Sequence, residues 1–206
     1  MFRPALIAVA AILPALTMPT LAAAQTAPLA QVSQHLRGVT TMTADFIQTD
    51  RMGKSVGGVL SMKRPGKVRF QYQKGVPLTI VGDGKALTVY DSAVRQESRW
   101  PIGNSPLAVL LDPSKDLTRI AKVVPAPNPR MLLVEARDPK HPEFGTTTIA
   151  FDRVASAPGG LTLMGWSTLD AQGNRSAVRL SNQRFNGPVD DRLFRWTNPR
   201  RAGPRG

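Results

Sequence analysis

The chain has 206 residues, and 27 Lys and Arg against 14 Asp and Glu give it a formal charge of +13. It contains no cysteine, which excludes disulfides, cysteine-ligated metal sites and the lipid-bearing cysteine of bacterial lipoproteins. This length corresponds to one domain with its own hydrophobic core.

The first 24 residues have the three parts of a secretory signal peptide. Arg3 supplies a positive charge, residues 5–18 are apolar, and small residues up to Ala24 precede Gln25. Pro14 breaks the apolar run and Pro19 follows it, and the run is shorter than the roughly 20 residues that a membrane-spanning helix requires. We expect a signal peptide over 1–24, cleaved near Ala24, and a single mature domain over 25–206.

Removing Arg3 with that leader leaves a charge of +12 (13 − 1). An exported protein meets anionic lipid headgroups more often than nucleic acid, so no nucleic-acid partner is expected. Arg195, Arg200, Arg201 and Arg205 gather near the end of the chain. We expect a flexible basic tail from about residue 200, either simply solvated or attracted to a membrane surface.

Two short helices and about eleven strands are predicted in chain order. Leu29, Val32 and Leu36 recur at helical spacing over 28–38, and Gly38 ends that helix. Alternating patterns and turn residues predict strands over 42–48, 56–63, 68–72, 78–81, 87–91 and 95–100. Ser105 as N-cap and Pro106 in the first turn predict a second helix over 106–111. Further strands are expected over 117–124, 131–137, 146–152, 161–168 and 176–183.

Consecutive strands with no helix between them exclude a parallel βαβ fold. We therefore expect a mainly β protein built on a single, strongly curved antiparallel sheet. Such a sheet can close on itself, or stay open and cover its apolar concave face with the two helices. The pattern alone leaves both arrangements open.

The sequence offers little catalytic chemistry. His35 and His141 stand without a second His or Cys at ligand spacing, and no nucleophile elbow or phosphate loop occurs. Asp190 and Asp191 are adjacent acids that we interpret as a solvated pair. We expect neither an enzyme nor a metal site nor a cofactor.

What the chain does offer is an alternating apolar register. The candidate inward-facing residues are Phe46, Leu60, Met62, Val68, Phe70, Ile80 and Val89. Taken by themselves, such residues favour a dry packed core over a ligand cavity.

Several motifs recur together in one order. A strand ends in Lys63-Arg64-Pro65 and the next strand carries Phe70. Around this pair stand Phe46-Ile47-Gln48, Gly82-Asp83-Gly84, Asn104-Ser105-Pro106-Leu107, Leu169-Asp170 and Phe194-Arg195-Trp196. Over about 150 residues this order resembles the outer-membrane lipoprotein carrier family, the LolA-like proteins.

The resemblance implies an open, incomplete β-barrel of about eleven strands with short α-helices as a lid. It implies a periplasmic, monomeric chaperone that carries acylated lipoproteins from an inner-membrane lipoprotein-releasing transporter to an outer-membrane acceptor. Arg64, with Pro65, would tie the lid to the sheet, and the seven inward residues would line a lipid-binding groove. A periplasmic binding module for a free lipid or glycolipid, or a lipoprotein-sensing regulator of the same fold, is the alternative. A lipid-metabolising enzyme ranks third.

Overall fold

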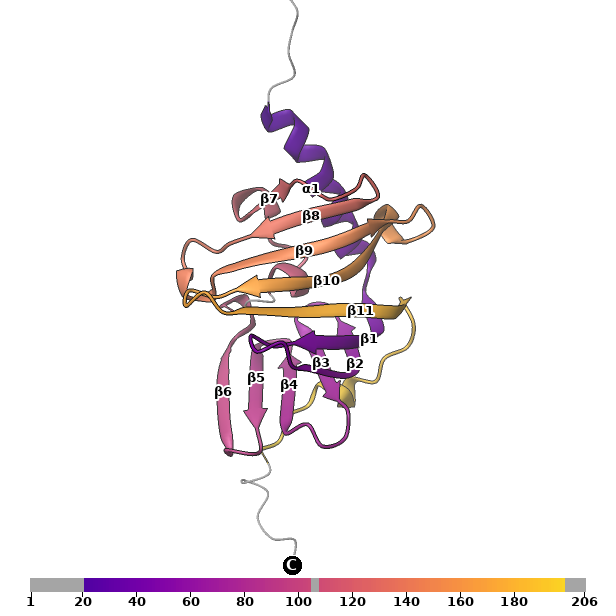
Figure 1. The fold of residues 1–206 in the computed structure, drawn as a ribbon. Coiled ribbons are helices and arrows are strands. Elements are labelled where there is room, and N and C mark those ends of the chain that lie inside the picture. Colours follow the sequence, from indigo (N-terminus) through magenta and orange to yellow (C-terminus); the bar gives the residue numbers. More distant parts are fainter. Residues whose placement is uncertain (1–20, 105–107, 199–206) are drawn as a thin grey trace, which may run out of the picture.

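The computed structural model describes residues 21–104 and 108–198, and for residues 21–26 and 104 the backbone alone. Within these ranges one sheet of eleven strands forms the whole framework, with strand order β6-β5-β4-β3-β2-β1-β11-β10-β9-β8-β7. Every pairing between neighbouring strands is antiparallel. In Figure 1, β8–β11 run across the molecule in front of α1, whereas β4–β6 descend below them.

The strands lie close to their predicted positions. They are β1 (Thr41–Thr49), β2 (Ser55–Lys63), β3 (Lys67–Tyr72), β4 (Leu78–Asp83), β5 (Ala86–Asp91), β6 (Gln96–Pro101), β7 (Ala121–Val124), β8 (Met131–Ala136), β9 (Thr146–Arg153), β10 (Leu161–Leu169) and β11 (Arg175–Phe185). The helices are α1 (Leu21–Gly38) and α2 (Ala108–Leu111), with short 3₁₀ turns η1 (Ile102–Asn104), η2 (Leu117–Arg119), η3 (Pro142–Phe144), η4 (Pro158–Gly160) and η5 (Asp191–Phe194).

The sheet is open. Neighbouring strands in the sheet are also consecutive in sequence, with one exception. That exception is the pairing of β1 with β11 in the middle of the sheet. This order leaves β6 and β7 at the two edges, so the sheet curves without closing. The single antiparallel sheet expected from the strand pattern, and the open form implied by the family resemblance, are confirmed.

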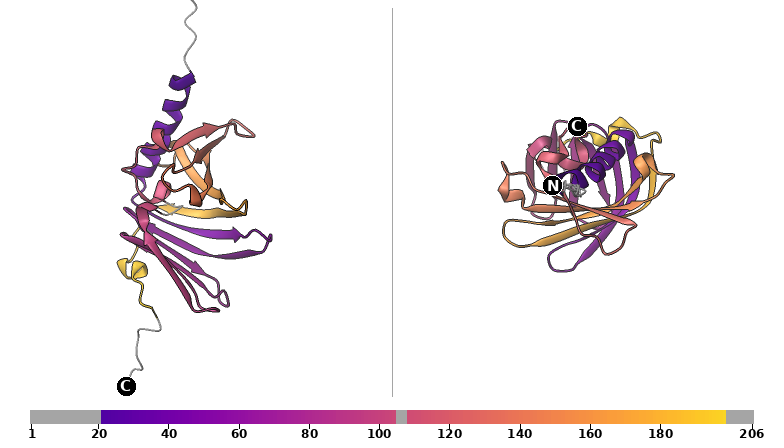
Figure 2. Two further views of the ribbon diagram at one scale, coloured as in Figure 1. Left: turned by 90° about the vertical axis from the view of Figure 1, so that its left-hand side faces the viewer. Right: turned by 90° about the horizontal axis from the view of Figure 1, so that it is seen from above.

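The helices cover the inner, apolar face of the curve. Leu29, Val32 and Leu36 of α1, and Leu110 and Leu111 of α2, belong to one buried cluster with the inward residues of both halves of the sheet. In the left view of Figure 2, α1 lies at the upper left and the hairpins of β1–β6 project to the right. No helix in the described part of the chain has the length and apolarity of a membrane span.

Two boundaries differ from the prediction. Within the described residues α1 already runs from Leu21, ahead of the expected start at residue 28, because the alanines at 22–24 are strong helix formers that continue the helix on the N-terminal side of Pro28. Residues 117–119 form η2 rather than the start of a strand, because the Asp116 carboxylate accepts the amide of Thr118 and caps a 3₁₀ turn. The strand starts only at Ala121.

Some expectations fall outside the described residues. They are the signal sequence over residues 1–20, the caps Ser105 and Pro106, and the tail from residue 199. The expected cleavage site near Ala24 lies within α1, where only the backbone is described.

Candidate functional site

The register of β1–β5 gathers the candidate groove residues on the inner face. Directly paired residues of antiparallel strands project to the same side of a sheet. Ala44, Leu60, Phe70, Ile80 and Val89 form one such row, and Met42, Met62, Val68, Gly82 and Leu87 form the next. Phe46 lies two residues beyond Ala44 and shares this side. The structure therefore brings all seven predicted residues to one surface.

Their burial divides them into two groups. Phe46, Leu60, Met62, Val68 and Phe70 are 2–3% exposed and belong to the central core. Ile80 is partly buried against that core, and Val89 is of intermediate burial. The groove surface is thus completely covered along β1–β3 and less so toward the edge strands.

Aromatic side chains form the centre of this surface. The Phe46 ring packs edge-on against Phe70 and Tyr72, at centroid distances of 5.2 and 5.1 Å. Gly58 of β2 lies between them, paired with Phe46 of β1 on one side and with Tyr72 of β3 on the other. Because Gly58 has no side chain, the two rings can meet. Trp166 of β10 reaches Phe70 from the other half of the sheet, at 6.2 Å. Tyr72 and Trp166 were absent from the predicted groove residues, since alternation within one strand carries no information on contacts between distant strands.

In this conformation the groove is filled. A cavity of only about 10 Å³ remains between the sheet and α2. Its lining includes Leu110 and Leu111 of α2 together with Leu60, Phe70 and Trp166. That volume is at most the room of one water molecule, so α2 packs directly on the apolar surface of the sheet in this conformation.

Arg64 ties both helices to the sheet. Its Nη1 donates hydrogen bonds to the carbonyl oxygens of Leu36 and of Val39, the latter at 2.9 Å, and its Nη2 donates to that of Leu110 at 3.0 Å. Leu36 lies in the last turn of α1, Val39 directly follows α1, and Leu110 belongs to α2. Burial lowers the pKa of the guanidinium to about 10, which leaves it cationic at neutral pH. Within the described residues its Nε has no hydrogen-bond partner.

The turn that carries Arg64 makes one further bond to α2. The Gly66 amide donates to the carbonyl oxygen of Leu111 at 3.1 Å. Gly66 has φ +72°, and a Cβ there would lie 2.9 Å from the carbonyl oxygen of Gly84, so glycine is required for this close approach. Pro65, between the two, is exposed in the same turn. We call Arg64 and Gly66, with the α2 carbonyls that they hold, the latch.

His35 is a buried part of α1 rather than a ligand. Its Nδ1–H donates to the Pro158 carbonyl oxygen at 2.8 Å, and its ring meets Phe151 and Phe185 edge-on. Burial, with a smaller contribution from the charge of Arg64, lowers the pKa of its imidazole. His141 lies elsewhere, stacked on Phe144 in a loop.

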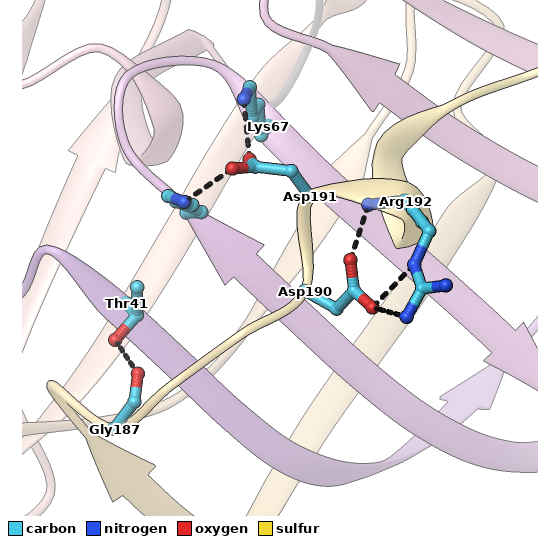
Figure 3. Close-up of polar contacts among 7 residues, drawn as sticks. Thr41, Lys67, Gly187, Asp190, Asp191 and Arg192 are labelled. Carbon is cyan, nitrogen blue, oxygen red and sulfur yellow. Dashed lines mark hydrogen bonds and ion pairs between the residues drawn. The ribbon is translucent and has the colours of Figure 1, made fainter.

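The adjacent acids near the C-terminus are not a simple solvated pair, which corrects the interpretation from sequence. The Asp191 carboxylate accepts from Lys63 Nζ at 2.9 Å and from Lys67 Nζ at 2.7 Å. Asp190 instead caps η5, accepting from the backbone and side chain of Arg192 (Figure 3). The two carboxylates point apart, and Asp191 makes long-range contacts that spacing cannot predict.

A larger hollow lies on the opposite, outer face. Its volume is about 750 Å³, and Met131, Ala150, Met164 and Arg179 are among the residues that line it on β8–β11. No predicted site residue lines this hollow. It arises at the bulge in β10 near Gly165, where the register with β9 shifts.

Comparison with known proteins agrees with this geometry. Residues 37–197 match the family model described as outer membrane lipoprotein carrier protein LolA. The outer-membrane lipoprotein carrier protein of Chromobacterium violaceum is 32% identical over 188 residues, covering 87% of each chain. Proteins of the same description from Dechloromonas aromatica and Actinobacillus succinogenes are 26% and 28% identical, covering 82% and 84% of this chain and 83% and 82% of their own. The chain therefore belongs to the LolA family of outer-membrane lipoprotein carrier proteins.

Proposed function

We propose that this protein is a periplasmic carrier that binds the acyl chains of lipoproteins between the inner face of its sheet and α2. One observation supports this most strongly. An entirely apolar surface is covered by a helix of four residues, whose backbone is held to the sheet by Arg64 and Gly66. A short segment fixed by a few hydrogen bonds can be displaced, whereas a core sealed by long helices cannot.

The relatives that carry the name of lipoprotein carriers support the choice of cargo. The signal-peptide pattern of residues 1–24 supports export to the periplasm. On this proposal the protein collects cargo as a monomer from an inner-membrane lipoprotein-releasing transporter and gives it to an outer-membrane acceptor. It acts by binding alone and needs neither catalysis nor a cofactor.

Reversible binding requires that lid closure competes with lipid. Each buried methylene contributes about 0.8 kcal/mol, so three acyl chains of about 16 carbons, if fully buried, would exceed the ceiling of roughly 20 kcal/mol seen for non-covalent binding. Release would then be too slow for a carrier. In this protein the bonds of the latch, and the burial of Leu110 and Leu111, are regained when lipid leaves. Their recovery lowers the net affinity to a value that permits transfer.

Native mass spectrometry tests the proposal. The mature protein is mixed with a triacylated lipoprotein and, separately, with the same protein lacking its lipid. We expect a one-to-one complex with the acylated cargo alone. A complex with both forms, or with neither, would contradict a carrier directed at acyl chains.

A free lipid or glycolipid is the second candidate ligand, and the outer hollow is the observation in its favour. At about 750 Å³ it lies within the usual size range of ligand pockets and is open in this conformation. A third sample containing phospholipid without protein separates the two candidates. Binding of phospholipid in preference to the acylated cargo would favour the second.

A further inference from the structure

The segment after β11, residues 187–198, crosses the outer face of the sheet. Its start is held where Thr41 Oγ1 donates to the Gly187 carbonyl oxygen at 2.7 Å (Figure 3). Further along the segment, Phe194 is 2% exposed, and the ring centroids of Trp196 and Tyr90 are 5.3 Å apart. Thr88 and Tyr90 alternate with the inward residues of β5, yet both are buried. We call residues 187–198 the strap.

The strap contacts the latch turn through Asp191. Lys63 and Lys67 are cross-strand partners at the ends of β2 and β3, and the latch turn runs between them. Asp191 Oδ2 accepts from Lys63 Nζ at 2.9 Å, and its Oδ1 accepts from Lys67 Nζ at 2.7 Å (Figure 3 labels Lys67). Lys67 Nζ also lies 6.0 Å from the centroid of the Phe194 ring. The carboxylate therefore joins the two strand ends that support Arg64.

The residues that flank this turn and the residues within it make contacts on opposite faces of the sheet. Lys63 and Lys67 turn outward to the strap, whereas Arg64 and Gly66 donate to α1 and α2 over the inner face. A change in the spacing of Lys63 and Lys67 must change the position of the donors between them. The two hydrogen bonds from the lysines lower the pKa of Asp191 to about 2, so the carboxylate is ionised throughout the physiological range.

We propose that Asp191 is a positioning residue for the latch: by bridging Lys63 and Lys67 it holds the turn in the shape that closes α2. The consequence for lipid release rests on the proposed carrier function. The effect on α2 itself does not, and can be measured without any ligand.

The chain provides a matched pair of variants for the test. Asp191→Asn removes the charge that bridges the lysines. Asp190→Asn changes the adjacent acid, which pairs only within η5, and an asparagine can still cap that turn. Each variant removes one negative charge from the strap, so a general electrostatic effect would appear in both.

The first readout is hydrogen exchange of the Gly66 amide in the ligand-free protein, because its partner is the Leu111 carbonyl of α2. We expect Asp191→Asn to raise this rate by about two- to fivefold, the range that exposed ion pairs allow, and Asp190→Asn to leave it unchanged. Equal rates in both variants and the wild type would overturn the proposal. If Asp191→Asn does not fold, Lys63→Gln with Lys67→Gln removes the same bridge and must give the same rise.

Lipid release separates positioning from a general loss of stability. Asp191→Asn should slow handover of acylated cargo by a similar factor while loading stays unchanged, and Asp191→Glu should restore it. A rise in Gly66 exchange with no acyl binding by the wild type would retain the coupling and reject the carrier function. A fall in melting temperature with unchanged Gly66 exchange would assign Asp191 a structural role only.

Discussion

The two helices over the inner face are held there by different means. α1 buries Leu29, Val32, His35 and Leu36 almost completely, and its three apolar residues belong to the central cluster. The described part of α2 is Ala108–Leu111, and within the described residues its polar attachment to the sheet comes from the donors of a single turn. The comparison supports the proposal that α1 stays part of the core while α2 opens.

Truncating one leucine in each helix gives the largest expected effect. Leu36→Ala should lower the free energy of unfolding by about 3 kcal/mol, because Leu36 is fully buried among residues that cannot rearrange. Leu111→Ala, equally buried, should cost less than half as much, since the loss is limited to the free energy of closing α2. Urea unfolding curves measure both, and equal costs would contradict the distinction between the helices.

Removing the latch arginine should affect transfer more than binding. We expect Arg64→Leu to load lipid normally but to hand it on at least about tenfold more slowly, because the closed state no longer competes with ligand. Arg99→Leu, which removes an exposed arginine paired with Asp83, is the control. Normal handover by Arg64→Leu in an in vitro transfer assay would count against the latch.

The smallest expected effect concerns pH and α1. Burial lowers the pKa of His35 below its usual 6.5, so the unfolded chain binds this proton more readily than the folded one. The free energy of unfolding is therefore unaffected by this group above about pH 6.5, and it decreases as the pH falls below that value. His35→Gln should flatten this dependence between pH 7.5 and 5. Thermal melts across that range decide, and an unchanged slope in His35→Gln would assign the effect to another group.

Local sequence pattern predicted most of the fold because β-strands of this sheet are amphipathic. Alternation at Met42, Ala44 and Phe46 located β1, and the order of consecutive hairpins followed from the absence of crossover helices. It failed where short-range capping overrides the pattern, as at Asp116 and η2. The same alternation placed the seven candidate residues on the inner face, and their role in binding lipid stays a prediction.

Contacts between distant segments could not be predicted from one sequence. Asp191 lies 128 residues from Lys63, and nothing in an adjacent acid pair indicates which member bridges two lysines. The contact of Trp166 with Phe70 depends on the curvature that brings two halves of the sheet together. Only the family resemblance pointed to Arg64, because an arginine before a turn is most often an ordinary surface residue.

Amide exchange during ligand binding tests the opening of α2 most directly. The Gly66 amide bonds to the Leu111 carbonyl of α2, and the Val39 amide bonds to the His35 carbonyl of α1 at 3.0 Å. On adding a triacylated lipopeptide, we expect exchange at Gly66 to rise by at least about tenfold while exchange at Val39 stays the same. Bound lipopeptide with both amides still protected, or with both released together, would contradict a lid that opens over a fixed α1.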